Sequence, residues 1–390
     1  MHRDNLDADF IPWRKRRYRV AKLHEMLSKL AHRGDPGAYL CVIVIKNGTV
    51  MDLPYIKNYK NVWTAKNRVR NFVSGLLEAS RGPTGLVLPD TAFLFSVRDT
   101  PHCGRKGDGC KVPVFAPIKR WDFSRNASDD YEVLLPQFAN VYTGELVFYP
   151  WEKKADKALL RSTLKARMKW NSTRQWLVEL GARPGNGALL DTGVIANEIK
   201  GFKPRLSKSV SIPDHARWRY IFHTDGITAS SRLGKVLAIN SVVLKEESHW
   251  IEYWYRSLIP NVHYVPFNKE NVLQVVSELQ RDPQRCQRIA DAAQHFMYRH
   301  FSQRAKAMYT RAALTSYNAL FDDMAAFMAS FSWDALKAAP GGPSVRGLLD
   351  QMKAFLRDPK PKAPVQGQAN QSTPQPQPQA QPSAEPKATQ

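Results

Sequence analysis

The sequence predicts an α/β fold in two domains, followed by a disordered C-terminal tail. Segments with strand-like apolar runs alternate with segments of helical spacing, which is the order that α/β domains show. The chain has 390 residues, 43% of them hydrophobic, which is enough for two domains with cores of their own. From Pro359 onward the composition changes to Pro, Gln and Ala, which form neither an apolar core nor regular hydrogen-bonded ladders.

The first domain is expected to alternate helices and strands. A basic amphipathic helix is predicted over residues 11–31. Asn47-Gly48 is a hairpin signal between strands at 39–45 and 50–53. The remaining elements expected here are a helix at 62–80 and short strands at 86–88, 93–97 and 112–117.

The second domain is expected to begin at residue 151, in a segment rich in Lys, Arg and helix formers that extends to residue 180. A strand at 219–224 ends at Asp225-Gly226, and a helical pattern at 229–239 leads to a strand at 241–244, which together predict a β-α-β unit. Helices are then expected at 271–280, 283–300 and 304–321. The predicted boundaries are 1–150 and 151–325 for the two domains, 326–358 for a helical extension, and 359–390 for the tail.

The chain is strongly basic, with a formal net charge of +22 at pH 7. Such a charge favours nucleic acid, an anionic membrane or a phosphate-bearing ligand as partner. The basic run at 13–19 is interpreted as the solvated flank of a helix, and no nucleic-acid-binding motif accompanies it, so no nucleic acid is expected. No signal-peptide core is visible, and no window approaches the ~18 apolar residues of a membrane helix, so no transmembrane segment is expected.

Two of the four cysteines bracket a polar loop. Cys103 and Cys110 are close enough in sequence for a local disulfide in an oxidising compartment. With His102 they also offer three metal ligands, one fewer than a closed structural zinc site needs. We favour the disulfide and keep the metal as the alternative, whereas Cys41 and Cys286 are expected to be buried thiols.

The β-α-β unit carries a candidate anion site. Ser230, Ser231 and Arg232 lie at the start of the expected helix, where free N–H groups and the positive end of the helix dipole attract an anion. Hydroxyl groups and a guanidinium that binds two oxygens at once suit a diphosphate better than a single carboxylate. The alternative is an ordinary strand and helix whose serine caps the helix N-terminus.

Four segments in this region resemble glycosyltransferase family 90, the capsule-associated and protein O-glucosyltransferase family. They are the glycine-to-arginine run at 226–232, the strand at 241–245, the aromatic-Glu-aromatic element at 250–255 and the proline-bounded strand at 258–266. The resemblance implies a GT-B type fold with two Rossmann-like domains. It also implies an inverting glycosyltransferase that moves glucose or xylose from a UDP-sugar to a hydroxyl group of a glycoprotein or polysaccharide acceptor, in the endoplasmic reticulum or Golgi lumen.

By the same resemblance, several parts of the second domain hold the donor. Arg161 and Ser162 match a family segment whose intervening glycine is absent here. Arg174 matches an arginine that contacts the donor diphosphate, and Asp191 is expected to touch the ribose or the base. The other donor contacts implied are Ile227, Thr228, Ala229, Ser230, Ser231, Arg232 and Glu252.

Asp99 is the candidate catalytic base. It follows the strand expected at 93–97 and precedes Pro101, so its carboxylate would face the crevice at the carboxyl end of a strand. The segment from residue 88 to 101 resembles the family block in which this aspartate deprotonates the acceptor. The alternative is that Asp99 caps a turn or pairs with Arg98. Asp90, which follows a proline, is interpreted as a turn residue.

No metal and no other cofactor is expected. A catalytic metal would need carboxylates placed together after a strand, and neither the pair at 7 and 9 nor the pair at 129 and 130 has that context. The histidines near the site, at positions 215, 223, 249 and 263, are scattered and are assigned to structural packing. The alternative function is a non-catalytic basic protein that keeps the fold and binds a glycan or nucleic acid.

Overall fold

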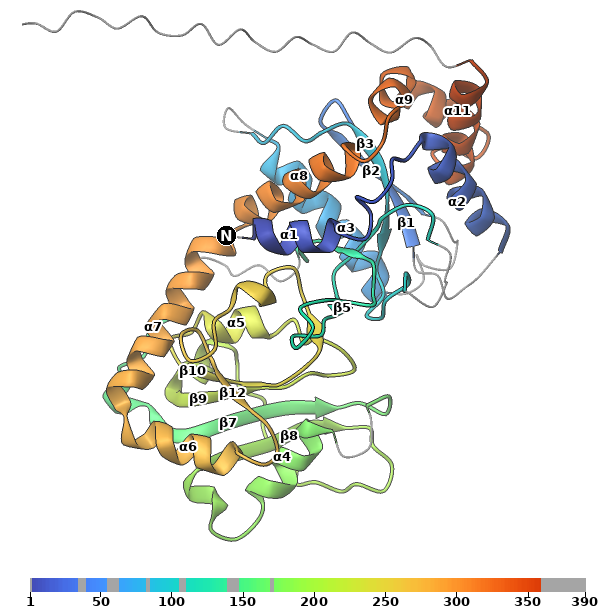
Figure 1. The fold of residues 1–390 in the computed structure, drawn as a ribbon. Coiled ribbons are helices and arrows are strands. Elements are labelled where there is room, and N and C mark those ends of the chain that lie inside the picture. The colour runs from blue at the N-terminus through green and yellow to red at the C-terminus, as the bar shows by residue number, and fades with distance from the viewer. Residues whose placement is uncertain are drawn as a thin grey trace, which may run out of the picture.

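The computed structural model describes residues 2–33, 40–54, 63–81, 85–104, 110–138, 147–168 and 172–358. The chain forms two α/β halves, one above the other in Figure 1, each built around a five-stranded sheet. This arrangement confirms the predicted α/β class of GT-B type. The predicted tail at 359–390 lies outside the described residues, and the domain boundaries stay a prediction.

The first sheet is mixed and has the strand order β2-β1-β3-β4-β6. β1 pairs antiparallel with β2 and β3, whereas β4 pairs parallel with β3 and β6. The predicted hairpin turns at Asn47 and Gly48, whose φ angles of 50° and 73° are the positive values that such a tight turn requires. The strands are β1 (Leu40–Lys46), β2 (Thr49–Pro54), β3 (Thr91–Ser96), β4 (Val114–Ala116) and β6 (Val133–Leu134).

The second sheet has the order β12-β10-β9-β7-β8, and all its neighbouring strands are parallel. β8 lies on one side of β7 and β9 lies on the other, so the direction in which strands are added reverses between β7 and β9. Open parallel sheets bind ligands at such a reversal, in the crevice outside the carboxyl ends of the strands. The strands are β7 (Ala155–Leu164), β8 (Leu190–Asn197), β9 (Trp218–His223), β10 (Val242–Glu246) and β12 (Val265–Phe267).

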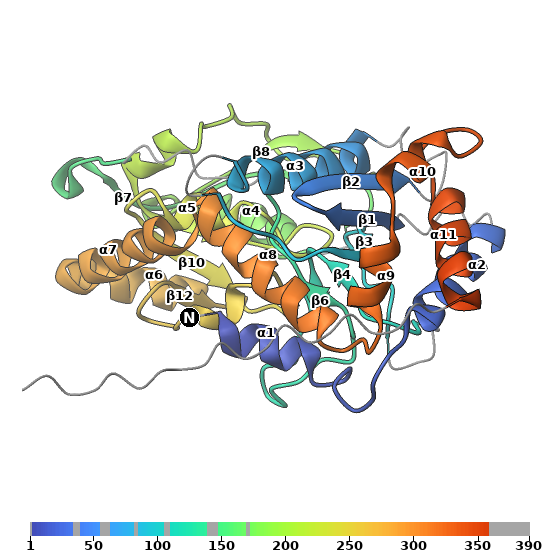
Figure 2. The same ribbon diagram turned by 90° about the horizontal axis from the view of Figure 1, so that it is seen from above.

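The helices of the second half pack on its sheet, and the chain then returns to the first half (Figure 2). α8 lies beside α3, and α11 packs against α2. No helix in the described ranges is long and apolar enough to cross a bilayer. The helices are α2 (Val20–Arg33), α3 (Trp63–Ala79), α4 (Thr173–Gly181), α5 (Leu233–Leu237), α6 (Val272–Arg281), α7 (Pro283–His300), α8 (Gln303–Asn318), α9 (Met324–Ser330), α10 (Trp333–Ala338) and α11 (Val345–Arg357).

The helix predicted over 11–31 is wrong at its start. A separate helix, α1 (Arg3–Phe10), ends before this segment, and α2 begins only at Val20. The backbone N–H of Tyr18 donates to the Leu320 carbonyl at 2.9 Å, and the N–H of Val20 donates to Asp323 Oδ1 at 2.8 Å. These partners are distant in sequence, so local spacing did not indicate where the helix starts.

Three further local predictions differ from the structure. Residues 86–88 are irregular rather than a strand. Residues 151–180 contain the ten-residue strand β7 before α4, because the buried run Ala158–Leu160 lies between β8 and β9 in the sheet. The helix predicted at 229–239 is limited to the five residues of α5.

The two halves are joined by β5 (Lys119–Arg120) and β11 (Trp250–Ile251), which pair antiparallel. Beside this ribbon, the carboxylate of Asp9 in α1 is buried between two cations. Its Oδ1 lies 2.7 Å from Lys119 Nζ and 2.8 Å from Arg256 Nη2. Burial lowers the pKa of Lys119, and the Asp9 carboxylate opposes that shift. The Asp9 carboxylate is therefore the shared ion-pair partner of two buried cations, and the charge of Glu132 adds to its effect on Lys119.

We predict that Asp9→Asn lowers the free energy of unfolding by about 3–5 kcal/mol, because it leaves two buried cations without their carboxylate. The matched control is Asp7→Asn, since Asp7 pairs with Arg14 on the surface and such pairs contribute less than about 1 kcal/mol. Urea denaturation of both variants measures the difference. Equally small losses of unfolding free energy in the two variants would show that the buried Asp9 cluster does not stabilise the contact between the halves.

Candidate functional site

A cavity of about 250 Å³ opens at the carboxyl ends of β7 and β9, where the strand order reverses. Its walls come from β7, α4, β8, the end of β9 and the segment before α5. The structure thereby brings together five of the predicted donor residues, three of which are arginines. The lining residues are Arg161, Ser162, Thr163, Arg174, Ile195, His223, Thr224, Ser230 and Arg232.

Arg232 is held in the cavity wall by backbone carbonyls. Its Nη1 donates to the Arg161 carbonyl at 2.7 Å, and its Nη2 donates to the Phe222 carbonyl at 3.4 Å. Its buried Nε has no hydrogen-bond partner within the described residues. Burial, and secondly the charge of Arg174, lowers the pKa of Arg232 to about 10. The guanidinium remains charged at neutral pH and has bonding capacity left for an anion.

Arg174 ties the ends of β7 and β9 together from α4. Its Nη1 donates to the Thr163 carbonyl at 3.1 Å, and its Nε and Nη2 donate to Thr224 at 3.2 and 3.1 Å. Burial lowers the pKa of this guanidinium, and the charges of Asp225 and Glu246 oppose that shift. Across the described ranges, neither Arg174 nor Arg232 forms an ion pair with a carboxylate, so the cavity keeps an excess of positive charge.

Asp191 orients Arg161 and does not line the cavity. Its Oδ1 lies 2.8 Å from Arg161 Nη2, and its Oδ2 accepts from Trp218 Nε1 at 3.0 Å. The buried Nε of Arg161 and Oγ of Ser162 have no hydrogen-bond partner in the described part of the chain. Two adjacent polar groups on β7 are therefore available to a ligand.

The turn between β9 and α5 supplies Ser230 and Arg232 to the cavity, while its other predicted residues, 227–229 and 231, are outside the lining. Thr228 and Ala229 are buried, whereas Ile227 is exposed. Ser231 is partly buried and lies two residues before the first residue of α5. The N-cap residue of α5 is Arg232, and no side chain caps the helix. The alternative in which a serine caps this helix is therefore wrong.

Gly226 in the same turn lies beside the guanidinium of Arg174. A β-carbon added at Gly226 would lie 3.5 Å from Arg174 Nη2. The adjacent Asp225 is partly buried, and this burial raises its pKa to about 6 against the hydrogen bond that it accepts from Ser248. A β-carbon at Gly226 would therefore make only an ordinary van der Waals contact with the guanidinium.

Asp99 lies in the other half, just beyond the carboxyl end of β3. Its Oδ1 is 2.5 Å from Nη2 of Arg68 in α3, and Arg68 Nη1 donates to the Val97 carbonyl at 2.7 Å. The Asp99 side chain is 44% exposed, so solvent and a substrate reach it. Asp90, by contrast, precedes β3 and accepts from the Asn47 N–H at 2.7 Å, which is a turn role.

Glu252 is buried and does not line the cavity. Burial raises its pKa to about 7, against a hydrogen bond from Trp254 and the charges of Lys306 and Arg68. Lys306 belongs to α8 and Arg68 to α3, so Glu252 faces groups of the first half. Its predicted contact with the donor stays a prediction.

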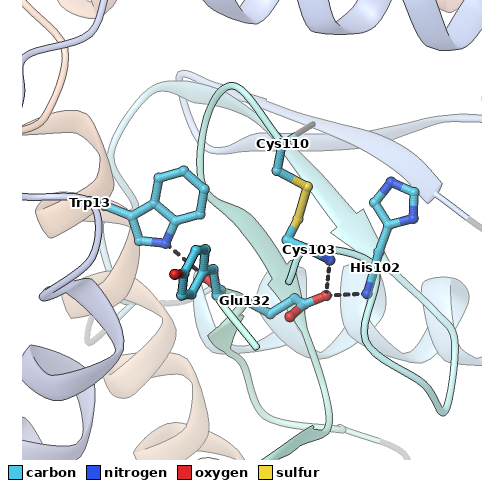
Figure 3. The surroundings of a disulfide bond; sticks show 6 residues. Trp13, His102, Cys103, Cys110 and Glu132 are labelled. Atoms are coloured by element: carbon cyan, nitrogen blue, oxygen red, sulfur yellow. Dashed lines mark hydrogen bonds between the residues drawn. A yellow bond between two sulfur atoms is a disulfide. The ribbon is translucent and has the colours of Figure 1, made fainter. Parts of the chain in front are cut away.

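Cys103 and Cys110 form a disulfide, with 5.6 Å between their α-carbons (Figure 3). The same loop is held by Glu132, whose Oε1 accepts from the backbone N–H groups of His102 and Cys103. The disulfide is therefore the correct one of the two alternatives. It constrains the segment that follows Asp99. In the described ranges there is no group of three His, Cys, Asp or Glu side chains that could hold a metal ion.

Sequence reasoning missed four of the residues that line the cavity, namely Thr163, Ile195, His223 and Thr224. Thr163 and His223 lie at the carboxyl ends of β7 and β9, so recognition of β7 as a strand would have pointed to them. Among the other histidines, His263 accepts from the Ile259 N–H and packs against Phe296.

Comparison with known proteins gives one family. The family model described as Glycosyl transferase family 90 matches residues 4–326. The chain is 25% identical to Protein O-glucosyltransferase 1 of Mus musculus over 59% of this chain and 63% of that protein. It is 26% identical to the O-glucosyltransferase rumi homolog of Aedes aegypti, over 60% and 62%. The chain thus spans slightly less than two thirds of the length of these relatives.

Two solved structures have a weaker likeness to the chain. Anabaena Alr3699/HepE in complex with UDP-glucose matches with a TM-score of 0.31 at 12% identity, over 40% of this chain and 48% of that one. A glycosyltransferase from Rickettsia africae ESF-5 matches with a TM-score of 0.33 at 12% identity, over 55% and 64%.

We predict that Arg232→Ala weakens UDP binding by roughly 1–3 kcal/mol, because it removes charge-assisted hydrogen bonds from a partly buried site. Arg217→Ala is the matched control, since Arg217 is an exposed arginine paired with Asp214. Titration calorimetry of both folded variants measures the affinities. An unchanged affinity for UDP in the Arg232 variant would remove this residue from the donor site.

Proposed function

The chain belongs to glycosyl transferase family 90, and we propose that it transfers a sugar from a UDP-sugar donor to a hydroxyl group of a protein or glycan acceptor. Glucose is the first sugar to test, because the curated relatives are named O-glucosyltransferases, and xylose is the second. The observation that carries the proposal is the arginine-lined cavity where the strand order reverses. A diphosphate is the part of the donor that such a cavity fits.

The donor would be held mainly through its diphosphate. Arg161, Arg174 and Arg232 reach the cavity from three different elements, and two of them have no carboxylate paired with them in the described structure. Ser162 and Ser230 add hydroxyl groups at the same wall. Because the three guanidinium groups are fixed by backbone and carboxylate contacts before a ligand arrives, they stabilise charge on a leaving UDP without reorganising.

Asp99 would act as the general base on the acceptor. Its carboxylate takes the proton of the acceptor hydroxyl as that oxygen attacks C1 of the sugar, and the bond from C1 to the UDP oxygen breaks in the same step. Attack from the side opposite to UDP inverts the configuration at C1. Arg68 positions the carboxylate through the 2.5 Å contact, and the half-exposed side chain is open to a bulky acceptor.

An oxidising compartment is part of the proposal. The Cys103–Cys110 disulfide supports it, since disulfides persist in the endoplasmic reticulum and Golgi lumen but are rare in the cytosol. Luminal proteins and glycans are then the acceptors to test. Nucleic acid is not proposed as a partner, because the positive groups described above converge in a cavity rather than along an exposed stripe.

We predict that Asp99→Asn reduces sugar transfer by ~100-fold to 10,000-fold while UDP affinity stays nearly unchanged, because an amide keeps the shape but cannot accept the proton. Asp90→Asn is the control, since that carboxylate has a turn role. Steady-state transfer to an acceptor that the wild-type chain uses measures both. Wild-type turnover in the Asp99 variant would require another base.

We propose that transfer needs no metal ion, because guanidinium groups are placed where a metal would otherwise offset the charge of the diphosphate. Release of UDP should therefore continue at its full rate after treatment with EDTA. The measurement is repeated with added manganese. Complete loss of activity on chelation and its recovery with manganese would contradict this mechanism.

A further inference from the structure

His223 occupies a position in the cavity that the mechanism above does not use. It is the last residue of β9, and its α-carbon is paired with that of Lys245 on the parallel strand β10. The side chain lines the cavity and is only 3% exposed. Its buried Nε2 has no hydrogen-bond partner among the described residues. A buried imidazole nitrogen that lacks a partner is costly unless a ligand completes it.

The charges that face His223 are mostly positive. Arg174 approaches from α4, Arg232 from the start of α5 and Lys245 from β10. Burial first, and then these cations, hold the pKa of His223 well below its usual value, so the imidazole is neutral in the free protein. The nearest carboxylates in this network, Asp225 and Glu246, act on Arg174 and Lys245.

Building on the proposed function, we propose that His223 is a donor-binding residue: its Nε2 hydrogen-bonds an oxygen of the sugar-nucleotide diphosphate, and the imidazole takes up one proton from solvent as the diphosphate binds. The cations around His223 lower its pKa because they disfavour an imidazolium. A bound diphosphate places negative charge among them and therefore raises that pKa. The proton adds a positive charge next to the oxygens that later leave with UDP.

The sign of the resulting pH dependence follows from the proton count. The complex carries one more proton than the free protein, so a lower pH favours the complex. Affinity for UDP-glucose therefore rises as the pH falls from about 8 to 6. Both phosphates of UDP-glucose are already fully ionised in this range, so the proton is taken up by the protein. Asp225, whose pKa burial raises to about 6, is the competing acceptor of that proton.

The test is titration calorimetry of the full chain with UDP-glucose in buffers of different ionisation heat, which counts the protons taken up on binding. We expect the wild-type chain and the Asp225→Asn variant to take up a proton on binding UDP-glucose. The His223→Gln variant should take up none, because glutamine keeps a hydrogen-bond donor near the Nε2 position but does not titrate. His223→Leu, which removes the donor as well, should weaken binding roughly 10-fold to 100-fold at pH 8. His263→Leu is the control for loss of a histidine that packs against Phe296 and should bind as the wild type does.

The outcomes separate this inference from the function on which it rests. No binding of UDP-glucose by the wild-type chain would overturn both. Wild-type binding with proton uptake that persists in His223→Gln, or that is lost only in Asp225→Asn, would overturn the role of His223 alone. Circular dichroism checks that each variant is folded. If His223→Leu does not fold, His223→Gln still decides the test.

Discussion

Three guanidinium groups converge at one edge of a parallel sheet, and this concentration of like charge is the constraint on which the second half of the molecule depends. Arg161, Arg174 and Arg232 would repel one another in a site that is largely withdrawn from water. Backbone carbonyls of β7 and β9 and the carboxylate of Asp191 offset part of that cost. The remaining repulsion would be offset by an anionic ligand, so the geometry favours diphosphate binding over a purely structural role.

The arginine-lined cavity and Asp99 lie in different halves, so the distance between them depends on the joint between the halves. The β5–β11 ribbon and the buried Asp9 cluster cross this joint, and α8 brings the chain back to the first half beside α3. α3 carries Arg68, which holds Asp99 and whose charge also acts on Glu252. The charge of Arg68 thus acts on a carboxylate in each half, Asp99 and Glu252.

The sequence contains enough local information to predict some parts of this site. Turn chemistry predicts the hairpin at Asn47 and Gly48, and periodicity predicts the strands on either side of α5. The family resemblance points to Arg174 and Arg232, which line the cavity. β7 was not predicted, because its buried run Ala158–Leu160 is short and is flanked by Lys157 and Arg161, which gives the segment the composition of a helix. The interruption before Val20 was not predictable either, because the groups that bond there come from residues beyond 319.

Roles that depend on one spatial neighbour were the hardest to predict. The predicted contact of Asp191 with the donor stays a prediction. The structure places Asp191 against Arg161 and Trp218, which the pairing of β7 with β8 and with β9 brings to it. The sequence assigns His223 to packing, and a single histidine on an apolar strand gives no sign of the three cations that the structure places around it. Both residues acquire their surroundings from strand order, which the sequence specifies only weakly.

The most direct measurement is a crystal structure of the chain with UDP-glucose bound. The account predicts that the diphosphate lies at the carboxyl ends of β7 and β9, with its oxygens within about 3 Å of guanidinium nitrogens of Arg161, Arg174 or Arg232. It also predicts that C1 of the glucose faces the half that carries Asp99. A nucleotide bound elsewhere, or a diphosphate in this cavity that contacts none of the three arginines, would contradict the account.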